Sequence, residues 1–152
     1  MPAAPAGALK AATADALTGL VPDRAAPLGF EVDFLPFEHC AGQMRRITRA
    51  QLDGWDLTTL ADDATLAVSE LVTNAVRYGK GRPVGLRVRC SAGELRIEVT
   101  DGSPTPARMR SADAADEDGR GLLLVAAVSK EWGVSSDGTM TWCSITIPEG
   151  GS

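Results

Sequence analysis

Alternating apolar and polar residues predict a β-hairpin in the second half of the chain. The two alternating runs are VGLRVRC at residues 84–90 and ELRIEVTD at residues 94–101, and only SAG separates them. Successive side chains of a strand point to opposite faces, so each run predicts a strand with one buried face. The short link containing a glycine favours antiparallel pairing.

Two further regions show the same alternation. GFEVDFLPFE, residues 29–38, carries Pro36 near its end, which suits an edge strand. Residues 133–148 predict a short strand, a turn at Asp137 and Gly138, and a closing strand in TMTWCSITIP.

Three segments have helical rather than alternating periodicity. Residues 41–55 space apolar side chains at helical intervals with three arginines opposite, as in an amphipathic helix. Residues 56–79 give the strongest helical pattern, with Thr58 or Thr59 as the expected N-cap and Gly79 as the stop. Residues 121–133 resume helix.

The order of these elements favours an α+β fold. We expect a two-layer α/β sandwich whose mixed, mostly antiparallel sheet carries its helices on one face. Residues 1–27 are rich in Ala, Pro and Gly, and we expect a disordered tail there. Residues 28–149 then form a single domain, because 152 residues leave little room for a second one.

Composition narrows the classes of function. A net charge of −5 and a pI near 4.8 leave no broad basic field, so we expect no direct nucleic-acid partner. The three cysteines are widely spaced and predict reduced thiols, and the single His39 excludes a histidine-based metal cluster. No run approaches the roughly 20 apolar residues of a membrane span, and the N-terminus lacks a secretory signal pattern. The expected compartment is the cytoplasm.

The helical segment SELVTNAVRYGKG places three polar residues along one stripe. Glu70 and Asn74 are four apart and Arg77 follows three later. Alone, such a stripe is most simply a solvated surface. In an otherwise apolar helix it can line a cavity, where a carboxylate can act as general base and an amide oxygen can bind Mg²⁺.

Two later features also fit either a structural or a functional interpretation. Asp101 and Gly102 end a predicted strand, which fits either a turn or an acceptor for an exocyclic amine such as that of adenine. Gly119, Arg120 and Gly121 precede a predicted helix, which fits an entry turn or a phosphate-binding N-terminus. The order of all these features along one chain is what favours a nucleotide site.

In that order, the motifs resemble those of the GHKL ATPase superfamily, which has the Bergerat fold. SELVTNAVRYG is similar to its N box, VTDGSPTP to its first glycine box and DGRGLLLV to its second. LPFEHCAGQMRRITRAQL and SKEWGV fit the anti-sigma-factor serine/threonine kinases and the short actinobacterial ATP-binding regulators.

The resemblance implies ATP and Mg²⁺ as cofactors and a role for each matching residue. It makes Glu70 the general base and Asn74 the Mg²⁺ ligand. The nucleotide-binding positions that it implies are Asn74, Arg77, Asp101, Gly102, Gly119, Arg120, Gly121, Leu122 and Thr139. Tyr78, Ser103 and Thr105 depart from the motifs, and the implied ATP lid, residues 103–118, is acidic.

The implied activity is that of a Mg·ATP-dependent protein serine/threonine kinase. It would bind a sigma factor or similar regulator and phosphorylate an antagonist protein. The alternative is a catalytically inactive module that senses ATP and binds proteins. The resemblance also implies a homodimer, and neither reading includes a membrane partner.

Overall fold

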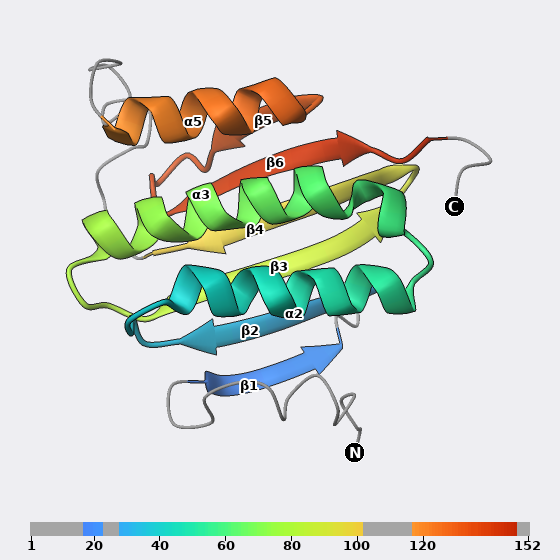
Figure 1. The fold of residues 1–152 in the computed structure, drawn as a ribbon. Helices are drawn as coiled ribbons and strands as arrows, with labels where there is room; N and C mark the ends of the chain where they lie inside the picture. The colour runs from blue at the N-terminus through green and yellow to red at the C-terminus, as the bar shows by residue number, and fades with distance from the viewer. Residues whose placement is uncertain (1–16, 23–27, 102–116, 149–152) are drawn as a thin grey trace.

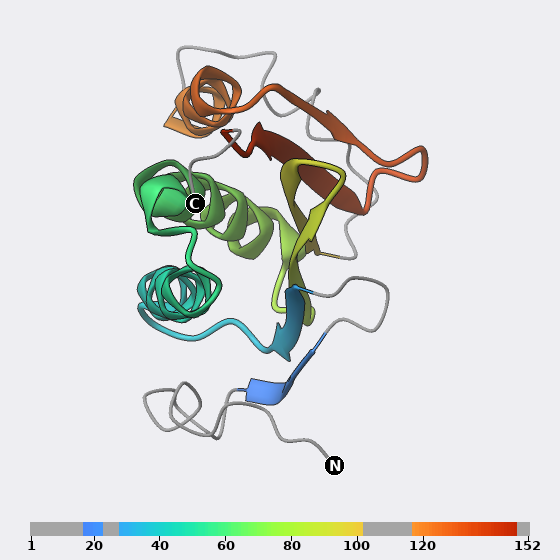
Figure 2. The same cartoon turned by 90° about the vertical axis from the view of Figure 1, so that its right-hand side faces the viewer.

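The structure is a computed structural model that describes residues 17–22, 28–101 and 117–148. It has two layers, a six-stranded sheet and a layer of helices on one face of it (Figure 1). Seen along the layers, the opposite face of the sheet carries no described helix (Figure 2). The predicted α+β sandwich with helices on one face is therefore confirmed.

The sheet has the strand order β1-β2-β3-β4-β6-β5. Its strands are β1 (Leu17–Pro22), β2 (Gly29–Phe34), β3 (Val84–Ser91), β4 (Glu94–Thr100), β5 (Glu131–Val134) and β6 (Met140–Thr146). Every strand pair among the described residues is antiparallel, which corrects the expectation of a mixed sheet. Between β3 and β4, Ala92 and Gly93 have φ of 53° and 80°, as the tight turn of the predicted hairpin requires.

The first strand corrects two predictions. β1 lies inside the segment expected to be a disordered tail, and it pairs with β2 from Leu17↔Phe34 to Pro22↔Phe30. Its order comes from this hydrogen-bonded ladder rather than from its own composition. β2 is consequently an inner strand and not the predicted edge strand, and Pro36 lies beyond its end. The rest of the predicted tail lies outside the described residues.

The helices follow the predicted order with shifted ends. They are α2 (Cys40–Gly54), the 3₁₀ turn η1 (Thr58–Leu60), α3 (Ala61–Gly79) and α5 (Glu117–Val128). Within the described residues, none of these helices is both long enough and apolar enough to cross a bilayer.

The start of α3 differs from its prediction. Leu60 is the N-cap and makes no side-chain capping hydrogen bond. Thr58 begins the 3₁₀ turn instead, and its hydroxyl donates to Asp53 Oδ1 at 3.2 Å. The predicted stop is confirmed, because α3 ends at Gly79 and Lys80 adopts a left-handed φ of 53°.

The start of α5 is also earlier than predicted. The helix begins at Glu117, so Gly119 and Gly121 lie inside its first turns and not before it. The first N–H groups of a helix have no intrahelical acceptor, and the first turn of α5 therefore offers such groups.

The core lies between the sheet and the helices. It contains the inward residues of the strands and the sheet-facing sides of α2 and α3, and its largest fully buried side chains include Phe30, Phe34, Met44, Leu52 and Leu71. The three cysteines are free thiols, as predicted.

The uncovered face of the sheet is polar, which explains why it needs no helix. The carboxylate of Glu98 is nearly buried there and lies 2.7 Å from Arg96, 3.3 Å from Arg89 and 3.9 Å from Arg87. The Arg96 guanidinium also lies 4.3 Å from the centroid of the Trp142 ring.

Candidate functional site

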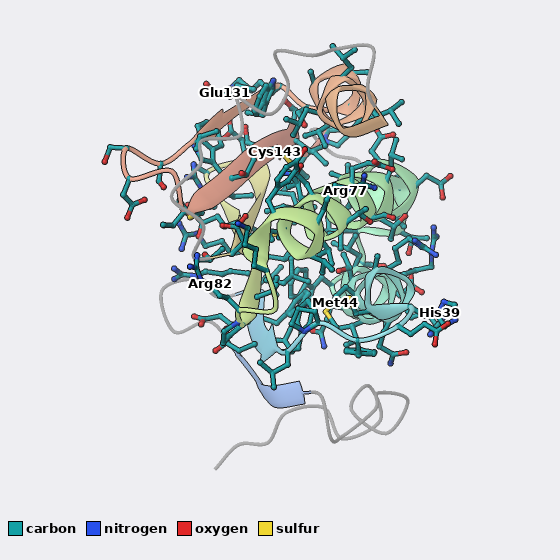
Figure 3. All side chains as sticks on the ribbon, turned by 90° about the vertical axis from the view of Figure 1, so that its left-hand side faces the viewer. His39, Met44, Arg77, Arg82, Glu131 and Cys143 are labelled. Atoms are coloured by element: carbon teal, nitrogen blue, oxygen red, sulfur yellow. The ribbon has the colours of Figure 1, made fainter. Side chains whose placement is uncertain are left out.

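The elements that carry the described site candidates meet at one end of the molecule. The carboxyl end of β4, the last turns of α3, the first turns of α5 and the residue before β6 meet there (Figure 1). Figure 3 looks onto this end, with Arg77 of α3 labelled. Three close contacts join these elements to one another.

The first approach joins α3 to α5. Glu70 is half-buried on α3, and a β-carbon placed on Gly121 of α5 would stand 2.8 Å from Glu70 Oε1. A side chain at residue 121 would require the carboxylate, which ends a flexible side chain, to turn away. Gly121 therefore allows the amino-terminal part of α5 to lie against Glu70 with the carboxylate as it stands.

The second approach joins the end of α3 to the end of β4. A β-carbon on Gly79 would stand 3.3 Å from the carbonyl oxygen of Asp101 and 3.6 Å from its Cβ. The third joins β4 to the start of β6, because the N–H of Asp101 donates to the carbonyl oxygen of Thr139 at 2.9 Å. These contacts place Asp101 between α3 and the strand β6.

Asn74 is the most informative side chain of the site. It lies one turn after Glu70, is 7% exposed, and its Oδ1 is buried without a hydrogen-bond partner among the described residues. A buried amide oxygen left without a donor costs roughly 1–3 kcal/mol. An orphaned oxygen of this kind fits a ligand that supplies the missing interaction.

A magnesium ion fits this oxygen. Mg²⁺ prefers oxygen ligands and commonly keeps several waters and substrate phosphates around one or two protein ligands. In the described part of the chain, no group of three or more His, Cys, Asp or Glu side chains could hold a metal alone. The donor set thus fits an ion held between Asn74 and a nucleotide triphosphate.

Asp101 supplies a buried carboxylate. Its side chain is only 4% exposed at the end of β4, on the strand that runs along the centre of the sheet. A carboxylate in this place can accept a hydrogen bond from an exocyclic amine, the role expected of it.

Thr139 lies beside Asp101 but uses its polar groups locally. Its N–H and its hydroxyl donate to Asp137 Oδ1 at 3.1 Å and 2.8 Å. Together with the Ser135 hydroxyl at 2.7 Å, which contributes most, they lower the pKa of Asp137 to about 2. Thr139 is therefore in contact with Asp101 through its backbone, while its hydroxyl donates to the turn before β6.

The positions of the remaining predicted residues say less about a nucleotide site. Arg77 shares the α3 stripe with Glu70 but is exposed in the last turn of the helix. Leu122 is 3% exposed in the core, so only its backbone could face a nucleotide. Gly119 and Arg120 lie in the first turn of α5, and Gly102 lies outside the described residues.

One residue of the site was not predicted. Gly79 was recognised only as a helix stop, although its lack of a side chain sets the contact with Asp101. This contact joins parts of the chain that are distant in sequence, so no local pattern indicated it.

The two-layer fold and the grouping of Glu70, Asn74 and Asp101 define the class of the protein, an ATPase-type domain with an α+β sandwich fold. The family described as histidine kinase-like ATPase domain matches residues 38–146, and the chain belongs to that family. The chain is also similar to an uncharacterized protein of Streptomyces coelicolor, with 35% identity over 75 residues that cover 47% of this chain and 71% of the relative. The family supports an ATP-binding regulatory protein.

Proposed function

We propose that this protein is a Mg·ATP-dependent serine/threonine kinase of the anti-sigma-factor type. It binds a sigma factor or similar regulator and phosphorylates an antagonist protein. The observation that carries the proposal is the pairing on α3 of the orphaned, buried Asn74 Oδ1 with the Glu70 carboxylate one turn away. This pair combines a metal ligand and a base on one rigid element.

Glu70 is suited to act as the general base. It would take the proton of a substrate serine or threonine hydroxyl as that oxygen bonds to the γ-phosphorus, while the bond to the β,γ-bridging oxygen breaks and ADP leaves. Bound magnesium, held by Asn74, would neutralise phosphate charge. Positioning and charge stabilisation are most of what phosphoryl transfer requires.

The other site residues would hold the nucleotide. The buried carboxylate of Asp101, next to Thr139, would accept a hydrogen bond from the exocyclic amine of adenine. N–H groups of the first turn of α5 would donate to phosphate oxygens, which the helix dipole also favours.

One observation favours the second candidate, a module that senses ATP without transferring phosphate. The close passage of Gly121 brings α5 against one side of the Glu70 carboxylate, the group that would have to meet a substrate hydroxyl. In such a module, ATP binding would change the position of α5 and the protein surface that it offers.

Nucleotide titration and phosphate transfer separate the two candidates. Calorimetry with ATP, with and without Mg²⁺, measures binding; transfer from ATP labelled at the γ-phosphate to co-purified partner proteins measures catalysis. In the kinase, Glu70→Gln should keep the dissociation constant for ATP and lower transfer about 10²- to 10⁴-fold. The matched control is Glu131→Gln, a change of an exposed carboxylate on β5.

The outcomes are distinct. Transfer that survives Glu70→Gln at the wild-type rate shows that Glu70 is not the base. ATP binding without transfer to any partner selects the sensing module. Absence of ATP binding by the wild-type protein removes both candidates.

A further inference from the structure

A second feature lies on the flank of α3 away from α5. Helices α2 and α3 run side by side there (Figure 1). An open cavity of about 400 Å³ lies between them, lined by Arg45, Arg46, Arg49, Ala50, Asp53 and Thr65. We call these six residues the arginine groove.

Neutral groups hold two of the three arginines in place. Arg45 donates to the Ser69 hydroxyl at 2.8 Å, and Arg46 donates to Gln43 Oε1 at 2.7 Å. A guanidinium held by a neutral acceptor is positioned but keeps its charge uncompensated. Among the described residues, neither guanidinium has a recorded ion pair.

The third arginine is partly compensated. Arg49 lies 3.0 Å from Asp62 Oδ1 and donates to Thr65 Oγ1 at 3.4 Å. The fourth charged residue, Asp53, already accepts from the Thr58 hydroxyl. The groove therefore has a net positive charge, on a chain whose overall charge is −5.

We propose that the arginine groove is a docking site for an acidic segment of a partner protein. Charge complementarity identifies the partner chemistry, because guanidinium groups bind carboxylates through paired, directional hydrogen bonds. The rest of the acidic chain repels such a segment, so attraction at the groove would also orient the partner.

The shape of the groove favours a protein segment over a small molecule. Sites for small molecules enclose most of the ligand surface. The groove is open, and four of its six lining residues are charged. It runs along the contact of two helices, where an extended or helical peptide can lie across several arginines.

The inference extends the proposed function, because it gives a regulatory protein a partner site separate from its nucleotide site. It does not require ATP to be bound. ATP binding is therefore measured on the same samples by calorimetry, so that the failure of one proposal is distinguishable from the failure of the other.

The test uses the full chain and a fluorescein-labelled ten-residue peptide of alternating Glu and Ala. Fluorescence anisotropy compares wild type, Arg45→Gln/Arg46→Gln, and the control Lys80→Gln/Arg82→Gln. Both double variants remove two positive charges, and the control residues are exposed just beyond the end of α3, which lies about 15 Å along the helix from Ser69, the partner of Arg45. We expect the groove variant to raise the dissociation constant about tenfold and the control to leave it nearly unchanged.

Three results would overturn the proposal. The first is that the wild type does not bind the peptide, and the second is that both double variants lose affinity equally. The third is that pyrophosphate or phosphatidylglycerol vesicles bind at the same groove more tightly than the peptide. The second result would indicate general charge attraction, and the third would assign the groove to phosphate. Loss confined to the groove variant, together with unchanged ATP binding, supports it.

Discussion

Gly121 on α5 lies so close to Glu70 on α3 that an added β-carbon would stand 2.8 Å from Oε1. Because Oε1 ends a flexible side chain, Gly121→Ala can be accommodated if the carboxylate turns away. Alanine is also favoured over glycine inside a helix, by about 0.8–1 kcal/mol. We therefore expect Gly121→Ala to keep or raise the free energy of unfolding in urea while lowering phosphate transfer.

Gly54 supplies the control for this prediction. It ends α2, and a β-carbon there would meet nothing within 4 Å. Gly54→Ala should leave transfer unchanged. Full transfer activity in Gly121→Ala would show that the position of the Glu70 carboxylate is unimportant.

Asn74→Leu should separate folding from ligand binding. Removing a buried amide oxygen that has no partner, while keeping the side-chain volume, should leave the free energy of unfolding without nucleotide unchanged or raise it by about 1 kcal/mol. Mg·ATP should then stabilise the wild type against urea, through its preferential binding to the folded state, but not the variant.

Thr48→Val is the matched control. Thr48 is fully buried on α2, and its Oγ1 also lacks a hydrogen-bond partner in the part of the chain that the structure describes. Its replacement should affect unfolding in the same direction but preserve stabilisation by Mg·ATP. Equal stabilisation of Asn74→Leu and wild type would contradict a role for Asn74 in holding the metal.

Elements that bury one face could be predicted from the sequence. The β3–β4 hairpin and α2 are of this kind, because the burial of one face produces a periodic pattern of apolar residues. β1 was missed because it is ordered by pairing with β2. The N-cap of α3 was misplaced because a 3₁₀ turn precedes the helix.

The site was predictable in part for the same reason. The stripe of Glu70 and Asn74 lies within one helix, so its spacing was visible in the sequence, although only the later motifs distinguished it from a solvated surface. The contacts of Gly121 with Glu70 and of Gly79 with Asp101 join distant parts of the chain, and no local pattern records them.

The turn before β6 predicts a pH dependence. Hydrogen bonds from Ser135 and Thr139 lower the pKa of Asp137 from 3.8 to about 2. The folded state therefore binds this proton more weakly than the unfolded state, so the contribution to stability is present above about pH 4 and is lost as pH falls towards 2.

The free energy of unfolding of the Asp137→Asn variant should consequently fall further below that of the wild type at pH 6 than at pH 2. Urea unfolding at the two pH values measures the difference, and carboxyl carbon NMR follows the titration directly. A midpoint near 3.8 in the folded protein would contradict the hydrogen-bonded turn.

Cys143 should be unreactive in the folded protein. It is fully buried on β6, and burial raises the pKa of its thiol to about 11. Because the thiolate is the reactive form, a disulfide reagent at pH 8 should modify Cys143 only after unfolding. Mass spectrometry of labelled peptides, with and without urea, tests this; modification of native Cys143 as fast as unfolded Cys143 would contradict it.

The pairing of β1 with β2 has a consequence for aggregation. Without β1, the unpaired backbone groups of β2 would form an open edge beside Phe30, Val32 and Phe34, and such an edge can pair with another chain. β1 is a poorer template, because its register shifts between Leu17 and Gly19 and it ends at Pro22. A protein shortened past Pro22 would therefore lose solubility before it lost the fold of its nucleotide site.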